Sequence, residues 1–327
     1  MVTVDRFSNK MALGMRRSLR LILLAISFAV AGQAAAESWV SELRRYDQQA
    51  ATIGHRLALA AREYCVNIAP ALGLSVDALE RYDLEDRALA QDELGLGGTV
   101  QISAVVPGAA ADRAGVAAGD DLISIAGKAI GQGAPGAASY ARTDAVLVAL
   151  GTASDAEFLE LGLRRGNTEF VTRLSPGVGC DVEWIVSTRS SRSTFTDGHA
   201  VDLPVGLFRF ARSDGEIAFV AAHELAHAIF RQRGKRPRSL SGKRELEHSA
   251  DALGVALLMQ AGFPPRDAAI FWTRFARADK LGFLRSADHP STKDRIRRIE
   301  ALIDEIDRGA RPEDIAERLI MRVDSLQ

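Results

Sequence analysis

The fold and the chemistry of this chain are decided by residues 217–230, IAFVAAHELAHAIF, in which apolar side chains surround two histidines and one glutamate. A continuous apolar run of this length predicts a buried helix. His223 and His227 are four residues apart, so their imidazoles leave the same face of that helix, one turn from each other. Two ligands of one metal ion need this geometry. Because burying three polar side chains without a function is costly, the pattern predicts a metal site.

A second predicted helix, residues 244–260, supplies the third ligand. Zinc in hydrolases has three protein ligands and leaves its fourth position to water. We expect Glu247 to complete a set of two histidines and one carboxylate. Its neighbours Glu245 and His248 are the alternative third ligands, since both side chains can bind zinc. The prediction is one Zn2+ per chain, although the same ligand set can hold other divalent ions.

Two further carboxylates have expected roles. Glu224 lies about a hundred degrees around the helix from the first histidine, where a carboxylate can take a proton from water activated by the metal. Zinc lowers the pKa of that water toward about 7, and the hydroxide attacks a peptide carbonyl. Asp251 lies one turn after Glu247 and is expected to accept the ring hydrogen of a ligand histidine. A purely structural zinc site has no use for Glu224.

In sequence order these residues resemble the gluzincin zinc metallopeptidases of the HtpX, Oma-type and CAAX prenyl protease family. The family shows His-Glu-x-x-His, then Glu-x-x-Ala-Asp, then His-Pro before a helix; here the three motifs begin at His223, Glu247 and His289. The resemblance implies that His223, His227 and Glu247 bind zinc. It also implies that Glu224 is the general base and that His289 stabilises the oxyanion. The other interpretation of His289 is a cap at the start of a helix.

The likeness spans roughly residues 180–300 and has two departures. Relatives such as HtpX have membrane spans near the site, whereas none is expected in the mature chain here, which therefore resembles the soluble periplasmic branch more closely. Many relatives carry Asn-Ala-Phe in a strand before the active-site helix, where this chain has Ser193-Thr194-Phe195 and then Asp197-Gly198-His199. The edge that aligns the substrate therefore differs in its details. His199 is a further candidate ligand, although a turn residue with a local hydrogen bond is the simpler interpretation.

Residues 94–175 show a different sequence pattern, with short apolar runs separated by glycine and proline turns. The predicted strands are 100–106, 121–126, 158–164 and 168–174, of which the last two form a hairpin, and the predicted helices are 109–114 and 141–150. The sequence from Val105 to Gly127 resembles the PDZ domains of bacterial envelope proteases. The resemblance implies a small β-rich domain of PDZ type.

PDZ domains bind the extended end of a peptide as an added strand, and backbone amides receive its terminal carboxylate. By analogy, Leu94, Gly95 and Leu96 would form the loop that binds the carboxylate. The alternative is a PDZ-shaped spacer without a ligand.

The remaining segments follow helical or strand patterns. Helices are predicted over residues 38–66, after 215 and over 292–319, and β structure is predicted over 182–186 and 200–210. The chain after 215 is therefore mainly helical.

The N-terminus carries a targeting signal. Arg16, Arg17 and Arg20 precede an apolar run over residues 21–31, and small residues follow up to Ala36. This order is typical of a secretory signal peptide, with cleavage expected near Ala36. The run is shorter than the about 20 residues of a membrane span. We expect a periplasmic or secreted protein without a stable membrane span; the alternative is an uncleaved anchor in the inner membrane.

The two cysteines, Cys65 and Cys180, bear on the same question. In an oxidising compartment they could form one disulfide, and the alternative is a pair of buried free thiols. Neither lies beside a histidine or a second cysteine, which argues against a catalytic cysteine.

The charge balance limits the partners. The chain has 41 lysines and arginines against 42 acidic residues, which gives no electrostatic reason to expect nucleic acid. The basic segment between Arg231 and Arg244 lacks aromatic residues, so we interpret it as a surface or flap segment rather than an RNA site.

Together these patterns predict an α+β protein. The expected divisions are a signal peptide (1–36), a helical segment (37–93), a PDZ-like domain (94–175) and a zinc metallopeptidase domain (176–327). We expect an endopeptidase that acts on envelope polypeptides, with protein quality control as the role that the family implies. The alternatives are a zinc-stabilised chaperone or scaffold that binds peptides without cleaving them, and a peptidase kept latent until a peptide occupies the PDZ-like domain.

Overall fold

The computed structural model describes residues 37–133, 136–153, 158–278 and 290–325. The helices and strands considered below lie in one compact unit, within residues 39–327. The expected signal peptide and His289 fall outside the described residues. Among the helices that are described, none has the length and apolarity that a membrane span requires.

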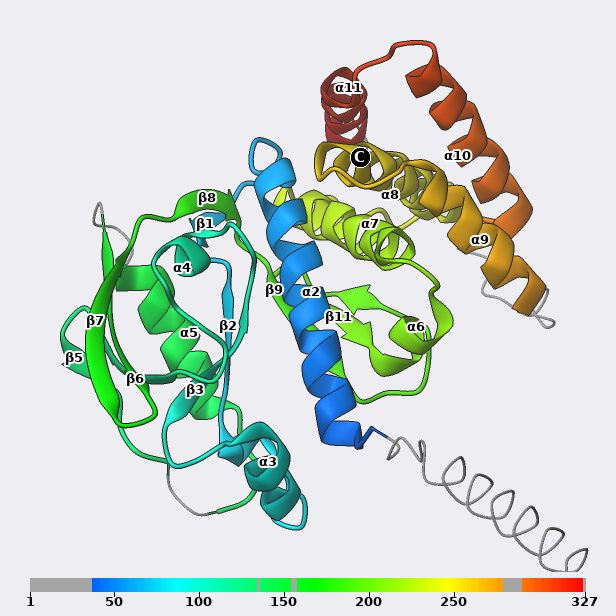
Figure 1. Ribbon diagram of the computed structural model, residues 1–327. Coiled ribbons are helices and arrows are strands. Elements are labelled where there is room, and N and C mark those ends of the chain that lie inside the picture. The colour runs from blue at the N-terminus through cyan, green and yellow to red at the C-terminus, as the bar shows by residue number, and fades with distance from the viewer. Residues whose placement is uncertain (1–36, 134–135, 154–157, 279–289, 326–327) are drawn as a thin grey trace, which may run out of the picture. The chain divides into compact units, whose positions relative to one another are not determined.

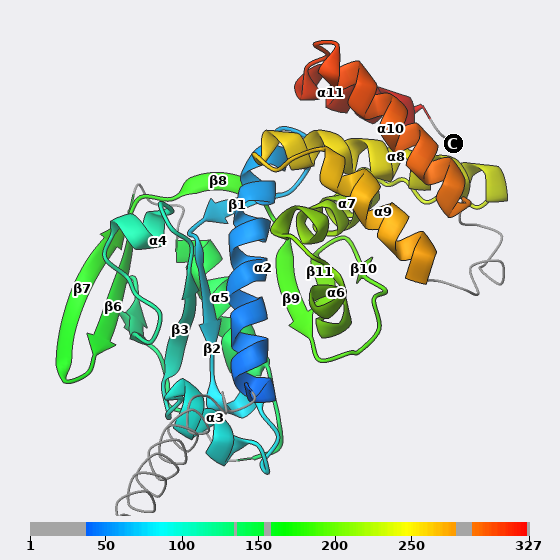
Figure 2. The ribbon, with the colours of Figure 1, turned by 45° about the vertical axis from the view of Figure 1, so that its right-hand side comes forward.

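The first described helix, α2 (Trp39–Ala61), lies between the two halves of this unit (Figures 1 and 2). Its apolar residues recur every three to four positions, so Ile53 and Leu57 belong to one buried face. That face packs on helices and strands of the metal-site half, while other positions contact the β-rich half. Arg44 of α2, for example, forms a 3.0 Å ion pair with the buried Asp77 of the β-rich half.

The β-rich half is a six-stranded antiparallel sheet with the order β2-β3-β4-β6-β7, in which β5 pairs with β4. Its elements are β2 (Leu74–Asp77), β3 (Val100–Val105), α4 (Ala110–Arg113), β4 (Asp121–Ile125), β5 (Lys128–Ala129), α5 (Ala141–Ala153), β6 (Leu159–Arg165) and β7 (Thr168–Leu174). The predicted hairpin is confirmed, since β6 and β7 pair around Gly166. The φ of 59° at Gly166 explains the glycine.

This sheet begins earlier in the chain than the sequence predicts. Residues 37–93 were expected to be helical, but the structure places two strands there, β1 (Ile68–Ala71) and β2, besides the short helix η1 (Leu79–Arg81) and α3 (Arg87–Leu94). A strand of four residues is too short to show a period of two. Its partner is also distant in sequence, because Leu74 pairs with Val105. The prediction was therefore wrong for this part of the segment.

The two ends of the β-rich half are fastened together. Strand β1 pairs antiparallel with β8 (Gly177–Cys180), with Ile68 opposite Cys180. A disulfide joins Cys65 to Cys180, whose Cα atoms lie 5.6 Å apart. The β1–β8 pair and the disulfide together hold the start and the end of the β-rich half close to the C-terminal end of α2.

The metal-site half combines a small sheet with helices. Its elements are β9 (Glu183–Ser187), β10 (Phe195–Thr196), β11 (Ala200–Pro204), α6 (Val205–Phe210), α7 (Asp214–Gln232), α8 (Leu240–Gln260), α9 (Arg266–Ala278), α10 (Thr292–Asp307) and α11 (Pro312–Asp324). The central strand β11 pairs parallel with β9 and antiparallel with β10. The β structure predicted over 200–210 ends at Pro204, and α6 follows, so that prediction was wrong in its second part. Proline cannot donate a backbone hydrogen bond, and it stands directly before the helix.

Helix α7 carries the apolar run and is buried along most of its length. Ser213 caps its start by accepting a hydrogen bond from the backbone N–H of Glu216. The helix packs across β11 and β10 on one side and against α8 on the other (Figure 2). The approach to α8 is close: a Cβ at Gly254 would lie 3.2 Å from the backbone nitrogen of His223. Helices and sheets are combined in both halves, which confirms the α+β class.

Candidate metal centre

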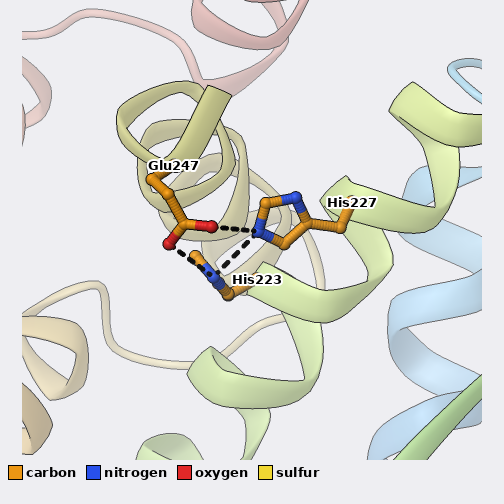
Figure 3. Close-up of side chains that lie close together, drawn as sticks. All are labelled: His223, His227 and Glu247. Atoms are coloured by element: carbon orange, nitrogen blue, oxygen red, sulfur yellow. Dashed lines mark hydrogen bonds and ion pairs between the residues drawn. The ribbon is translucent and has the colours of Figure 1, made fainter. Parts of the chain in front are cut away.

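Three side chains converge between α7 and α8 (Figure 3). The Nε2 atoms of His223 and His227 lie 3.2 Å apart. The Oε1 atom of Glu247 lies 3.2 Å from Nε2 of His227, and its Oε2 atom lies 3.9 Å from Nε2 of His223. The two histidines come from one face of α7, and the glutamate faces them from α8. One potential ligand atom from each residue therefore points to a common centre.

These separations fit a small divalent cation. Zinc binds imidazole nitrogen and carboxylate oxygen at about 2.0–2.2 Å, so two ligands of a tetrahedral ion lie about 3.3 Å from each other. Two of the three separations are 3.2 Å and the third is 3.9 Å, and all the ligand atoms lie within 4.8 Å of one another. Two nitrogens and one oxygen also leave one tetrahedral position for water. The residues present thus match a hydrolytic zinc site in donor type, number and spacing.

Asp251 supports this cluster from behind. Its Oδ1 atom lies 3.1 Å from Nδ1 of His223, so the ring nitrogen that faces away from the centre has a carboxylate acceptor. Asp251 is buried, and burial alone would raise its pKa. The guanidinium of Arg295 and the imidazole of His223 outweigh burial and hold the pKa of Asp251 at about 2. The carboxylate is therefore ionised at neutral pH and can fix the orientation of the imidazole.

Arg295 is a buried site residue to which the sequence analysis gave no role. Its Nε donates a 2.6 Å hydrogen bond to Oδ2 of Asp251, and its Nη1 lies 3.5 Å from Oε2 of Glu247. The guanidinium carbon lies 3.8 Å from the centroid of the Trp272 ring. A signal was present in the sequence, because Arg295 precedes Ile299 and Ile303 at helical spacing and so lies on the apolar face of α10.

Glu224 is buried and lines a cavity of about 510 Å³ together with the three cluster residues. Thr194, just before β10, donates a 2.6 Å hydrogen bond from its Oγ1 to Oε1 of Glu224. The lining of the cavity also includes aromatic rings and arginines, among them Phe219, Phe271, Trp272, Phe275, Arg192 and Arg295. A carboxylate held by one hydrogen bond at the wall of a cavity is well placed to exchange a proton with a molecule inside it.

The structure separates the alternative ligands from this cluster. The carboxylate of Glu245 pairs with Arg322, and Nε2 of His248 lies 3.1 Å from Asp294. The Oδ1 atom of Asp197 accepts a hydrogen bond from the backbone N–H of His199, as expected for a turn. Glu245 and His248 therefore interact with residues outside the cluster, and His199 lies in a turn. The structure brings Glu247, rather than its neighbours, to the two histidines.

Leu94, Gly95 and Leu96 have a local structural role. Leu94 ends α3, the N–H of Gly95 donates to the carbonyl of Gln91, and Leu96 is buried in a small core with Val40. The amide of Gly95 is thus already used in capping the helix. A second Leu-Gly-Leu sequence, at residues 72–74, leads directly into β2, which is an edge strand of the sheet. Sequence reasoning overlooked it because β2 was not predicted.

Comparison with known proteins gives limited matches. No protein-family model matches the chain. The mitochondrial metalloendopeptidase OMA1 of Schizosaccharomyces pombe is 26% identical over an alignment of 164 residues, covering 38% of this chain and 48% of that protein. The chain therefore spans about half the length of the curated relative that it matches.

Among solved structures, the HtrA3 PDZ domain bound to a phage-derived ligand matches 34% of this chain and 89% of its own. The sequence identity is 18% and the TM-score is 0.24, which is too low to establish a shared fold. The His-His-Glu cluster and the sequence match agree on one point. This chain is a distant and partial relative of a metalloendopeptidase.

Proposed function

We propose that this protein is an exported, zinc-dependent metalloendopeptidase that hydrolyses peptide bonds of envelope proteins. The observation that carries the proposal is the position of Glu224, a buried carboxylate at the wall of the cavity that also holds His223, His227 and Glu247. A metal site that only stabilised the fold would have no use for this carboxylate. The distant relation to a metalloendopeptidase supports the same reaction class.

Each residue of the site has its own role in the proposed reaction. His223, His227 and Glu247 would hold a divalent cation, which would supply Lewis acidity for a carbonyl group and for water. Glu224 accepts the proton from the attacking water and delivers it to the leaving amine. Thr194 holds the Glu224 carboxylate in position through its 2.6 Å hydrogen bond. Peptide-bond hydrolysis needs no other proton acceptor on the enzyme in this scheme.

The test is the substitution Glu224→Gln, which keeps the shape of the side chain and removes its basicity. We expect cleavage of an unfolded reporter protein to fall by about 10²–10⁴-fold. The metal content should stay at one zinc per chain. Glu300→Gln, at an exposed position of α10, is the matched control and should retain wild-type turnover. Unchanged cleavage by Glu224→Gln would exclude Glu224 as the base, and binding of the reporter without cleavage by the zinc-loaded wild type would favour a zinc-stabilised chaperone or scaffold.

Export to the periplasm or the medium is part of the proposal. It is supported by the basic, apolar and small-residue order of residues 1–36 and by the disulfide between Cys65 and Cys180, a bond typical of oxidising compartments. Fractionation followed by N-terminal sequencing tests it. We expect a periplasmic or secreted chain that begins at Glu37. A full-length chain in the membrane fraction would instead support an uncleaved anchor.

The β-rich half is proposed to bind peptide ends beside β2, an edge strand among the described residues that also contacts α5. The support is the edge position of β2 and the Leu-Gly-Leu sequence at residues 72–74. Labelled peptides with free and amidated C-termini test this: the free ends should bind more tightly than the amidated ones to Glu224→Gln. Equal binding, or none, would indicate a spacer. A rise in reporter cleavage on adding a free-ended peptide would support the latent peptidase.

A further inference from the structure

The pairing of α7 with α8 continues beyond the metal cluster. His223 faces Asp251 at 3.1 Å, and His227 faces Glu247 at 3.2 Å. Each step adds four residues on α7 and subtracts four on α8, so the two helices run antiparallel with matching faces. The next step in this series would place Arg231 opposite Lys243, and both residues line one cavity. Two cations therefore follow the metal ligands on the same side of the helix pair.

A second cavity, of about 300 Å³, opens at this step. It shares His227, Arg231 and Glu247 with the cavity of Glu224, so the two cavities adjoin at the cluster. Its lining combines four cationic residues with the carboxylate of Glu247 and two apolar residues; these are Arg231, Lys235, Arg236, Lys243, Leu246 and Pro237. A divalent cation bound to Glu247 would offset its negative charge, so that this carboxylate would not cancel the cations of the lining.

The basic segment is held in place beside the cluster. The amide of Lys235 donates to the carbonyl of Phe230 after Gly234, whose φ is 76°, which closes the end of α7. The side chain of Lys235 donates a 2.6 Å hydrogen bond to the backbone carbonyl of Asp324, and Arg233 pairs with the carboxylate of Asp324. The segment between α7 and α8 is thus fastened to α11 at two points.

Like charges placed in one cavity repel each other. Within the described residues, no ion pair joins Arg231 or Arg236 to a carboxylate. Arg231 also lies beside the turn that follows β10, since a Cβ at Gly198 would be 3.4 Å from Cβ of Arg231. A peptide lying along β10 would therefore pass close to Arg231, next to the peptide bond that is to be cleaved at the metal site. The aromatic rings line the other cavity, toward Arg192.

We propose that this basic cavity, defined by Arg231, Lys235, Arg236 and Lys243, is a subsite for a carboxylate of the substrate peptide, so that the enzyme prefers bonds with an acidic residue on one flank. The inference rests on the proposed peptidase function and names its substrate class. The carboxylate can belong to an Asp or Glu side chain or to the peptide C-terminus. Salt should weaken the preference, because the cavity is open to solvent.

The test compares matched peptides that carry Glu or Gln within three residues of the cleaved bond, each with a free or amidated C-terminus. For the zinc-loaded wild type we expect kcat/KM to be about tenfold higher for Glu than for Gln, as one charge-assisted hydrogen bond provides. The double variant Arg231→Gln, Arg236→Gln should cleave the two alike. Arg238→Gln, an exposed position in the same segment, is the control and should keep the preference.

The outcomes separate the subsite from the proposed function. Equal rates for all four peptides in the wild type, or an equal loss for all four in the double variant, would overturn the subsite while leaving the peptidase intact. Faster cleavage of the free-ended than of the amidated peptides, with Glu and Gln alike, would assign the carboxylate to the peptide C-terminus. If no peptide is cleaved, binding of the same labelled peptides to Glu224→Gln still decides. Stronger binding of Glu than Gln, or of free than amidated ends, that is lost on adding Arg231→Gln and Arg236→Gln supports the subsite, and equal binding of all four peptides refutes it.

Discussion

The carboxylate of Asp251 lies 3.1 Å from Nδ1 of His223, on the side of the imidazole opposite to the nitrogen that faces the metal centre. The same carboxylate receives Nε of Arg295 at 2.6 Å. One buried anion therefore positions both a ligand and a cation. Changes at Asp251 should affect metal affinity and stability together, which distinguishes it from a residue that only packs.

Asp251→Asn should lower zinc affinity by about 10–100-fold, as found when the carboxylate behind a ligand histidine is lost. The amide cannot serve as an anionic acceptor for the imidazole, and it leaves Arg295 without its buried partner. Competition with a fluorescent chelator measures the affinity. Asp304→Asn, at an exposed position of α10, serves as control. Equal zinc affinity in wild type and Asp251→Asn would contradict the assigned role.

Arg295→Lys should destabilise the protein although it keeps the charge. Lysine cannot contact Asp251 through two nitrogens and also lie flat on the Trp272 ring. We expect a loss of about 1–3 kcal/mol in the free energy of unfolding. Arg295→Met should cost about 3–5 kcal/mol, because Asp251 would stay buried without its cationic partner. Urea unfolding of the two variants measures both values. The free energy of unfolding should be lowest for Arg295→Met, intermediate for Arg295→Lys and highest for the wild type, and any other order would contradict the role of Arg295.

Thr194→Val should lower kcat about three- to tenfold, because the carboxylate of Glu224 loses the hydroxyl group that holds it. Valine keeps the shape of threonine, so folding and zinc content should not change. Thr194→Ser restores a hydroxyl and should recover most of the rate. A valine variant with wild-type kcat would show that Thr194 does not position the base.

The disulfide should be a major source of stability. It joins residues separated by 115 positions and so restricts the unfolded chain strongly. We expect reduction to lower the free energy of unfolding by about 2–4 kcal/mol. The double variant Cys65→Ser, Cys180→Ser should show the same loss without reductant and no further change when reductant is added. Urea unfolding with and without reductant provides the measurement.

Asp47 of α2 should make stability depend on pH. Burial raises its pKa from 3.8 to about 6, against the charges of Arg81 and Arg44. The folded protein thus binds this proton more tightly than the unfolded chain, so its stability falls as the pH rises from about 4 to 6. Asp47→Asn should remove this loss and stabilise the protein by about 1–3 kcal/mol at pH 7.5, but hardly at pH 4. Unfolding curves at both pH values, with the exposed Asp92→Asn as control, check the difference.

Local sequence patterns were enough for the elements that carry the chemistry. The four-residue spacing of His223 and His227 fixes two imidazoles on one face because an α-helix has 3.6 residues per turn. The hairpin of β6 and β7 follows from turn residues next to two alternating runs. The order of the motifs also allowed Glu247 to be chosen over its neighbours before the helices were placed. In each case the physical cause lies within a few residues of the pattern.

Tertiary structure decided what those elements meet. The close approach of α7 and α8 at Gly254 sets which carboxylate reaches each histidine. The arrival of Arg295 behind the cluster depends on the packing of α10 against α8 and α9. The start of the sheet at Leu74 depends on pairing with a distant strand. The place of the basic segment beside the metal ligands depends on the contacts of Arg233 and Lys235 with Asp324. These positions come from contacts between residues far apart in the chain, which no local period or spacing encodes.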